Sequence, residues 1–468
     1  MEKCMRKKLI SLIAVLALVA ICAACLVACN PYKFDGIGGG EPNATVESNG
    51  GYAVKQGKYL YYINGYEGSD ADNTWGKPTL QNIVRAELNE DGTVNNETTK
   101  VVVPKSIYNV STSTGFAIYG EWIYYATPNY DKDKYGNAST TNTDFMRTKI
   151  DGSVTQRLGV IGSRSAEYIF FPTRVLYYTS NTISYLDFAG LQTKKSSDST
   201  DNSKKGDIAT SVTSVKWKYG CEDIFYTQSA TGTESYKNYN MLKAVKYDGT
   251  NERTLATQNT FLETGESAEM NPQKVYKYTL QDMFVEADGK ATLYYTMTYM
   301  KDSDTTVGLF CAKADDFKNT HKLLNTLGST TLFPLGYAEG ALAYNKDSVY
   351  CWYNGENAED PHQVTTTSQT VWYVKDGYAY VTASSSAKTL YKITYNKKVN
   401  NQTPIMEEGI KVDGLKLDFI GDNLFFFATD DENYTHVVNI KTFNKDEKDA
   451  ESTYIGFERE EEEEEDEE

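Results

Sequence analysis

The sequence predicts an all-β protein folded as a single β-propeller, and three observations lead to this fold class. A short aliphatic-aromatic motif recurs along most of the chain, hairpin signals follow the motif, and no segment shows the 3.6-residue apolar periodicity of an amphipathic helix. We expect eight blades. A seven-bladed ring with one irregular unit is the alternative.

The recurring motif is an aliphatic residue followed by an aromatic pair, usually preceded by a turn residue. The clear copies are Leu60-Tyr61-Tyr62, Ile123-Tyr124-Tyr125, Leu176-Tyr177-Tyr178, Ile224-Phe225-Tyr226 and Leu293-Tyr294-Tyr295; the weaker copies are Leu342-Ala343-Tyr344, Ala379-Tyr380-Val381 and Leu424-Phe425-Phe426. Successive copies are 37 to 69 residues apart. These intervals centre near the ~40–50 residues of a propeller blade. The irregular unit would be the one around Leu342, where the aromatic pair is broken.

A second strand follows the motif and ends in an Asp-Gly turn in several units. Examples are the strand before Asp151-Gly152 and the strand before Asp248-Gly249. Alternating apolar residues closed by Asp-Gly indicate a β-hairpin, and we expect type I′ turns there. Another apolar run precedes most motifs, so each unit has three strands and a weaker fourth. Closure into a ring hides the sheet edges that would otherwise promote aggregation.

The paired aromatic residues are expected to be structural. Adjacent residues of a strand point to opposite faces of the sheet, so each Tyr of a pair meets a different neighbouring blade. We therefore expect the pairs to pack between blades rather than to bind a ligand.

The motifs resemble the YWTD-type blades of lipoprotein-receptor propellers, and more closely a related bacterial propeller family of unknown function. The resemblance rests on Leu176 to Thr179, Ile224 to Thr227 and Leu293 to Thr296, and it extends over roughly residues 52–443. This chain has Tyr where the receptor family has Trp, and it lacks that family's Asp in nearly every unit. The resemblance implies a propeller and extracellular binding, but no particular ligand.

The N-terminus has the layout of a secretory signal peptide. Basic residues precede the apolar run from Leu9 to Val19, and small residues lead to Leu26-Val27-Ala28-Cys29, which resembles the bacterial lipobox. The resemblance implies cleavage after residue 28 and lipidation of Cys29, which gives a protein anchored on the extracytoplasmic face of the cell membrane. The alternative is an uncleaved transmembrane anchor, because residues 9–28 are long enough to span a bilayer.

The regions that flank the propeller are expected to be unstructured. Residues 29–51 would form a lipidated, Gly-rich flexible tether with a reach of about 25 Å, and residues 52–457 would form the propeller. Residues 458–468 form an acidic tail, which self-repulsion keeps disordered.

Charge and cysteine content exclude some functions. The net charge is −17; residues 1–28 contribute +3 and residues 458–468 contribute −9, which leaves −11 for the body. An acidic body does not favour nucleic acid as a partner. Cys221, Cys311 and Cys351 are too few for a disulfide framework, and we expect three buried thiols. One disulfide with a spare thiol is the alternative.

No catalytic or metal motif stands out. The three histidines are far apart, and no Cys-x-x-Cys or His-Glu-x-x-His spacing occurs, so we expect no metal and no cofactor. Asp131 to Gly136 lacks the later acids of a calcium loop. No Gly-x-Ser-x-Gly elbow is present, and the acidic pairs stand in polar turns. The sequence assigns no catalytic residue.

We therefore expect a monomeric, non-enzymatic binding module whose partner is an envelope protein or a glycan. The alternatives are an extracytoplasmic enzyme that acts on polysaccharide and an envelope assembly scaffold. Convergent carboxylates above an aromatic floor in the funnel would favour the enzyme. The candidate contacts are aromatic residues of three long insertions in units one, two and four, namely Trp75, Tyr130, Tyr135 and Tyr236.

Overall fold

The protein is described by a computed structural model of the chain. The model describes residues 34–65, 81–105, 107, 115–129, 141–191, 204–231, 238–300, 306–327, 331–344, 346–356, 361–384, 390–396, 402–406, 411–412, 418–421, 423–429, 435–440 and 452–457.

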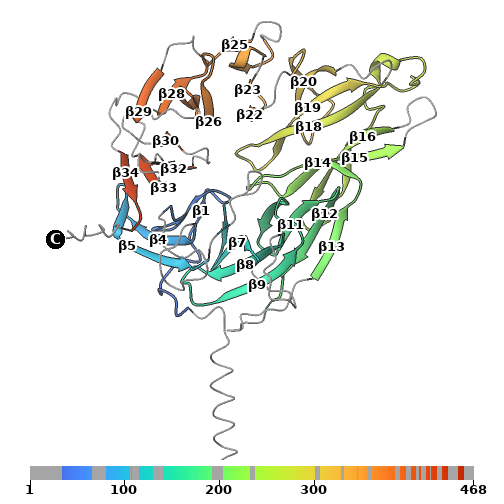
Figure 1. Ribbon diagram of the computed structural model, residues 1–468. Coiled ribbons are helices and arrows are strands. Elements are labelled where there is room, and N and C mark those ends of the chain that lie inside the picture. The colour runs from blue at the N-terminus through green and yellow to red at the C-terminus, as the bar shows by residue number, and fades with distance from the viewer. Residues whose placement is uncertain are drawn as a thin grey trace, which may run out of the picture.

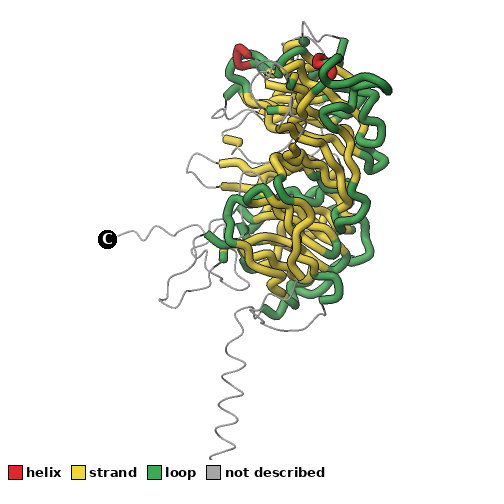
Figure 2. Tube along the Cα trace, turned by 90° about the vertical axis from the view of Figure 1, so that its right-hand side faces the viewer, coloured by secondary structure: helices red, strands yellow, loops and turns green. Residues whose placement is uncertain are grey.

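The described residues form eight antiparallel sheets that follow one another around a ring (Figure 1). Turned by 90°, the ring is thinner than it is wide (Figure 2). In chain order the sheets are β1–β5 (Val46–Glu47, Ala53–Gln56, Tyr59–Ile63, Ile83–Leu88, Val94–Val103), β6–β9 (Ala117–Tyr119, Trp122–Pro128, Thr143–Lys149, Thr155–Ile161), β10–β13 (Glu167–Phe171, Arg174–Thr179, Thr182–Asp187, Lys204–Ala209), β14–β17 (Val212–Lys216, Asp223–Thr231, Asn238–Lys246, Arg253–Ala256), β18–β21 (Tyr276–Val285, Ala291–Tyr299, Thr306–Lys313, His321–Leu324), β22–β25 (Leu332–Pro334, Ala341–Tyr344, Tyr350–Tyr353, His362–Gln363), β26–β29 (Thr370–Lys375, Tyr378–Thr382, Leu390–Thr394, Gln402–Met406) and β30–β34 (Lys411–Val412, Asp418–Ile420, Asn423–Thr429, Thr435–Ile440, Ser452–Ile455). Two short 3₁₀ turns, η1 (Pro272–Lys274) and η2 (Lys346–Ser348), interrupt the strands.

The expected all-β single propeller is confirmed, and its sheets are not equivalent. In seven sheets at least one strand has six residues or more, whereas no strand of the sheet β22–β25 is longer than four. The structure thus has seven regular blades, and the sheet around Leu342 is the irregular unit that the sequence left open. Eight blades, our first expectation, are not supported. Pro334, which has no N–H to donate, ends β22, and Gly340 with φ 87° precedes β23.

The ring closes without strand exchange among the described residues, because every sheet consists of strands consecutive in sequence. Strand β2 of the first sheet lies beside β31 of the last. The Asp418 carboxylate accepts hydrogen bonds from the backbone N–H groups of Tyr52 (2.6 Å) and Ala53 (3.3 Å), and the Ser48 hydroxyl donates to the Phe419 carbonyl (2.7 Å). These hydrogen bonds join the first sheet to the last.

Removing the Asp418 side chain should destabilise this closure. Hydrogen bonds to charged groups contribute about 1.5–3 kcal/mol. We expect Asp418→Ala to lower the free energy of unfolding by about 2 kcal/mol, and Asp418→Asn, which keeps an acceptor oxygen, to lower it by less. Equilibrium urea denaturation measures both. An unchanged midpoint for Asp418→Ala would show that the ring closes without this contact.

The aromatic pairs of the second and fifth units pack as predicted, whereas the pair Tyr177-Tyr178 is only half-buried. Tyr124 belongs to the apolar cluster between the second and third sheets, whereas Tyr125 belongs to the cluster on the side of the first sheet. Tyr294 and Tyr295 divide in the same way between two clusters. All four side chains are buried. Their rings therefore hold neighbouring blades together and are not available to a ligand.

The Asp-Gly hairpins are present, but their turns are not of type I′. Gly152 has φ 74° and Gly249 has φ 85°, whereas Asp151 and Asp248 are not in the left-handed region. Each Asp instead accepts a hydrogen bond from the backbone N–H two residues later, at 2.9 Å in both turns. The Asp side chain thus makes the hydrogen bond of an Asx turn, and only the following Gly adopts a positive φ.

The described part of the expected tether, residues 34–51, packs against the ring instead of extending from it. Ile37 donates its N–H to the Asp151 carbonyl (2.7 Å), Arg85 donates to the Gly38 carbonyl (2.7 Å), and Val46–Glu47 adds strand β1 to the first sheet. A Cβ at Gly36 would lie 2.6 Å from the Asp151 oxygen. The glycines of this segment therefore permit close approach to the ring, and the expectation of flexibility is wrong for residues 34–51.

The three cysteines are free and buried, as expected. Cys311 lies in β20 and Cys351 in β24, while Cys221 precedes β15. Burial raises the pKa of the Cys311 thiol to about 12. These thiols are packing residues of the blades.

Candidate functional site

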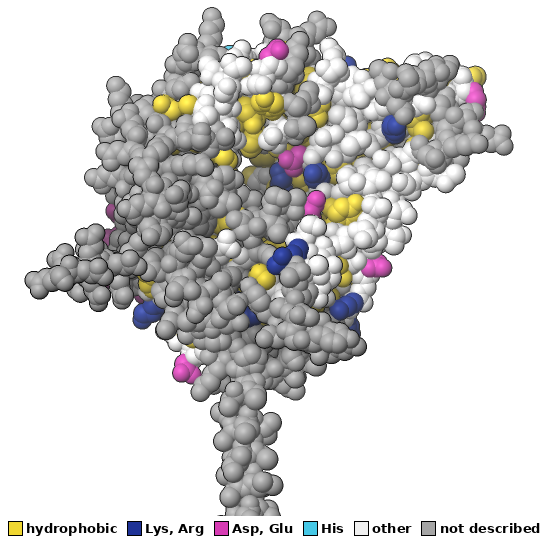
Figure 3. All heavy atoms as spheres, viewed as in Figure 1, with side chains coloured by type: hydrophobic (Ala, Val, Ile, Leu, Met, Phe, Trp, Pro, Cys, Tyr) yellow, Lys and Arg dark blue, Asp and Glu magenta, His cyan; other side chains and the backbone are white. Residues whose placement is uncertain are grey.

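An axial cavity of about 530 Å³ is the candidate site. It is lined by the segment before β2 and by residues of β10, β14 with its following turn, β18, β26 and β31. The first or second strand of several sheets thus contributes, as expected at the centre of a propeller. Figure 3 shows acidic and basic side chains gathered around a hollow in the middle of this face.

Three carboxylates and two lysines line the axial cavity. Asp418 is held by the backbone of β2, as described above. Asp282 accepts a hydrogen bond from the Met283 N–H (2.7 Å) and forms an ion pair with Lys218 (3.1 Å). These two carboxylates are therefore fixed in place by their partners.

Glu167 differs from the other two carboxylates. It is the first residue of β10, it is half-buried, and no hydrogen bond or ion pair to it occurs among the described residues. Burial raises the pKa of its carboxyl, and the charge of nearby Lys216 opposes this only in part. A half-buried carboxyl without a hydrogen-bond donor is poised to accept one from a ligand.

Aromatic side chains supply the apolar part of the axial cavity. Tyr168 comes from β10, Trp217 and Tyr219 follow β14, and Tyr373 comes from β26. The Tyr219 hydroxyl accepts a hydrogen bond from the Phe170 N–H (3.3 Å), which fixes its ring. Burial raises the pKa of Tyr373 to about 12, with the charges of Asp418 and Asp376 contributing. These tyrosines are therefore neutral. Tyr373 is half-buried and can offer part of its ring and its hydroxyl group, whereas the Tyr168 ring is buried against Phe145 and Phe170.

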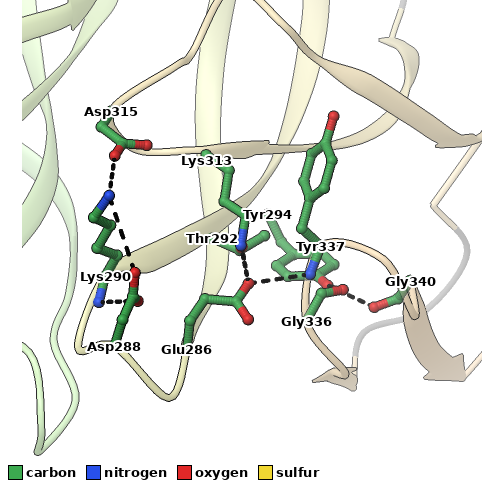
Figure 4. A network of polar contacts seen from close by, with 10 residues as sticks. All are labelled: Glu286, Asp288, Lys290, Thr292, Tyr294, Lys313, Asp315, Gly336, Tyr337 and Gly340. Atoms are coloured by element: carbon green, nitrogen blue, oxygen red, sulfur yellow. Dashed lines mark hydrogen bonds and ion pairs between the residues drawn. The ribbon is translucent and has the colours of Figure 1, made fainter.

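A second polar cluster, drawn in Figure 4, has a structural role. Glu286 accepts hydrogen bonds from Lys313 and Thr292 (both 2.6 Å) and from the Tyr337 N–H (3.3 Å). Burial raises the pKa of its carboxyl, but these hydrogen bonds outweigh burial and hold that pKa below its usual range. The Tyr294 hydroxyl lies within hydrogen-bond distance of the Gly336 carbonyl (2.8 Å). The cluster joins β18–β20 to the turn between β22 and β23 of the irregular sheet.

The ligand contacts proposed from the sequence cannot be placed. Trp75, Tyr130, Tyr135 and Tyr236 lie outside the described residues, as do Cys29, residues 458–468 and most of the three insertions. The insertions do connect the second and third strands of the regular four-strand order in their units, β3 to β4, β7 to β8 and β15 to β16. They therefore occupy corresponding places, as the sequence indicated.

The residues of the axial cavity were missed by sequence analysis. Each stands in or beside the weak first strand of its unit, where the sequence signal is an isolated polar residue next to an apolar run: Glu167 precedes Tyr168 to Phe171, and Asp418 precedes Phe419. Within the described residues no group of three or more His, Cys, Asp or Glu side chains is placed to hold a metal ion. No helix in the described part of the chain is long and apolar enough to cross a membrane.

Comparison with known proteins identifies no family. No family model matches the chain, and no curated protein matches it. Solved structures do match. The β-propeller domain of the Trilobed protease from Pyrococcus furiosus has a TM-score of 0.38 at 9% identity, covering 88% of this chain and 95% of that one. Polysaccharide lyase Uly1 has a TM-score of 0.35 at 9% identity, covering 72% and 92%.

Longer proteins match in part. Puromycin hydrolase has a TM-score of 0.38 at 11% identity; the match covers 88% of this chain and 54% of the hydrolase, so the chain spans about half the length of that protein. At these identities and TM-scores none of the matches bears on function. The resemblance to the lipoprotein-receptor type of blade stays a resemblance of short motifs.

Proposed function

We propose that the protein is a membrane-anchored, extracytoplasmic binding module that takes a glycan into its axial cavity. The observation that carries the proposal is the composition of that cavity: Glu167, which has no hydrogen bond or ion pair among the described residues, lines it together with the half-buried aromatic residues Trp217 and Tyr373. Sugars present apolar C–H faces that pack on aromatic rings and hydroxyl groups that donate to carboxylates, so the lining is complementary to them.

The shape of the site favours a glycan over a protein as the ligand. A volume of about 530 Å³ lies in the range of roughly 300–1,000 Å³ that small-ligand sites occupy. Protein partners instead bury about 800 Å² on each side, over 20–30 residues of a broad surface. A concave polar site at the ring axis accommodates part of a sugar chain.

Membrane attachment through Cys29 completes the proposal. The sequence around Cys29 supports it, and the packing of residues 34–51 on the ring would keep the distance from anchor to propeller short. We expect Cys29→Ser to release the protein from the membrane fraction of the expressing bacterium. Retention of the variant would favour the uncleaved transmembrane anchor.

Trp217→Ala is the test of the proposed site. The full chain, purified in detergent, would be applied to an array of bacterial and plant polysaccharides and neutral oligosaccharides. We expect wild-type protein to bind a subset of these glycans and Trp217→Ala to bind them at least tenfold more weakly, because a stacking face is lost.

The matched control is Trp352→Ala. Trp352 is also half-buried, but it lies in β24 away from the cavity, where its indole N–H donates to the Glu339 carbonyl (2.9 Å). Its binding should equal that of the wild type. An array with no bound glycan, or equal weakening by both variants, would contradict the proposal.

A polysaccharide-acting enzyme is the second candidate, because three carboxylates converge on one aromatic-lined cavity and burial raises the pKa of Glu167. A general acid needs such a raised pKa, and hydrolysis needs a second carboxylate across the sugar. Asp282 and Asp418 are already engaged in hydrogen bonds or an ion pair, and this favours binding over catalysis. Incubation of each bound glycan with the protein, followed by chromatography of the products, decides: new chain ends that disappear in Glu167→Gln would establish the enzyme.

A further inference from the structure

A second cavity of about 680 Å³ adjoins the axial cavity. It is formed by the end of β9, the connection to β10, and the β11–β12 hairpin. Glu167 lines both cavities. The side chain that has no partner in the axial cavity thus stands at the junction of two hollows.

The lining of the second cavity is polar and nearly uncharged. Ser163, Ser165, Ser180 and Asn181 contribute hydroxyl and amide groups, and Tyr177 and Tyr178 contribute rings. Glu167 is the one charged residue among the described residues that line it. Such a lining complements a neutral ligand that is rich in hydroxyl groups, and it offers no cation for a phosphate or a uronic acid.

The wall between the two cavities is the start of the β10–β11 hairpin. Glu167 is the cross-strand partner of Tyr178, so both side chains lie on the same face of the sheet. The Tyr178 hydroxyl donates to the Val212 carbonyl of β14 (3.1 Å), the strand that also carries Val215 and Lys216 of the axial cavity. Tyr178 is therefore fixed beside Glu167, at the point where one cavity meets the other.

We propose that the two cavities are consecutive subsites for one linear, neutral oligosaccharide that passes over Glu167. This inference rests on the proposed function and deepens it, because it names the ligand class and predicts a dependence on chain length. Glu167 accepts hydroxyl groups from the sugar units on both of its sides. The rings of Trp217 and Tyr178 then support the chain in the axial and second cavities, respectively.

Titration calorimetry of the full chain with size-graded probes tests the inference. The probes are the cello-, chito- and manno-oligosaccharides of one to eight units, in the series that the array selects. We expect affinity to rise as the chain lengthens from the size that fills one cavity to the size that fills both, and to level off beyond it. Glu167→Gln should weaken the long probes at least tenfold.

The variant Asn181→Gly tests the contribution of the second cavity separately from that of the axial cavity. Asn181 has φ 61°, so glycine keeps the turn conformation and removes only the amide side chain. We expect the variant to bind long probes about fivefold more weakly and short probes unchanged, as for the loss of one hydrogen bond. The control is Asn251→Gly, because Asn251 has φ 53° in an exposed turn that lines neither cavity.

The outcomes distinguish the two proposals. Short probes that bind and lose affinity in Trp217→Ala, combined with no gain from longer chains, would leave the proposed function standing and overturn the two-subsite inference. A chain-length gain that survives in Asn181→Gly and in Ser165→Ala would also overturn it. Wild-type protein that binds no probe of any length would overturn both.

Discussion

Arg157→Met lowers the free energy of unfolding by about 3–5 kcal/mol, the cost of breaking a buried ion pair by removing one of its members. Arg157 and Asp144 are paired at 2.8 Å, with side chains that are 4% and 1% exposed. The second carboxylate oxygen of Asp144 accepts a hydrogen bond from Asn129 (2.6 Å). In the variant the buried carboxylate keeps the Asn129 amide and the charge of the buried Lys105 but loses the guanidinium. Urea denaturation measures the loss.

The effect of Arg157→Met should depend on pH. Burial already raises the pKa of the Asp144 carboxyl in the wild type, although Asn129 and the charges of Arg157 and Lys105 oppose it. Removing the guanidinium raises that pKa further. A carboxyl with a higher pKa in the folded state than in the unfolded state destabilises the fold as the pH rises above the unfolded value of about 3.9. The deficit of the variant should therefore be largest near pH 7 and should shrink toward pH 4.

Two controls define this prediction. Lys246→Met breaks an exposed pair with Glu222 (2.8 Å), which water already screens, so the unfolding midpoint should stay nearly constant. The double variant Asp144→Leu with Arg157→Met removes both charges of the pair and should recover part of the lost stability, because the buried Lys105 still loses the nearby carboxylate. A double variant no more stable than Arg157→Met would show that the ion pair itself, rather than the unpaired charge, sets the cost.

The sequence predicts the blades well because the physics of a blade is local. Strand alternation and a turn residue specify each hairpin, as at β8–β9 around Asp151, and the broken motif at Leu342 marks the irregular sheet. The glycines at 36–40 misled the prediction, because the same residue supplies either flexibility or close approach. Asp151 lies against Gly36 and Ile150 against Gly40 in the folded ring, and these positions determine that the glycines serve close approach rather than flexibility.

The candidate site was not predictable because ring closure creates it. Glu167, Trp217, Asp282 and Asp418 come from four sheets and are up to 251 positions apart in the chain. The chain has no repeated motif or fixed spacing that connects them. The predicted contacts were loop aromatics, which are the usual binding residues of a rigid scaffold. In the structure the candidate site is formed instead by side chains in or beside the first strands of several sheets.

Phe145→Ala should have the other large effect on stability, a loss of about 3–5 kcal/mol. Phe145 lies in β8 and is fully buried. Its ring meets the rings of Tyr168 and Phe170 in β10 edge-on, with centroids 5.3 and 5.7 Å away. The substitution opens a cavity between the second and third sheets. Met270→Ala is the control, since that side chain is 68% exposed and its loss should change stability by less than about 0.5 kcal/mol.

Phe145→Ala should also weaken ligand binding, although Phe145 does not line either cavity. Tyr168 packs against Phe145 and lines the axial cavity, and it follows Glu167 directly in β10. In the variant the Tyr168 side chain is free to move into the space left by Phe145, and it no longer holds the start of β10 in one position. Binding of the array-selected glycan should therefore fall in Phe145→Ala at a temperature where the protein is still folded, and stay constant in Met270→Ala. Unchanged binding would mean that the rest of the ring positions Glu167 without the packing between these two blades.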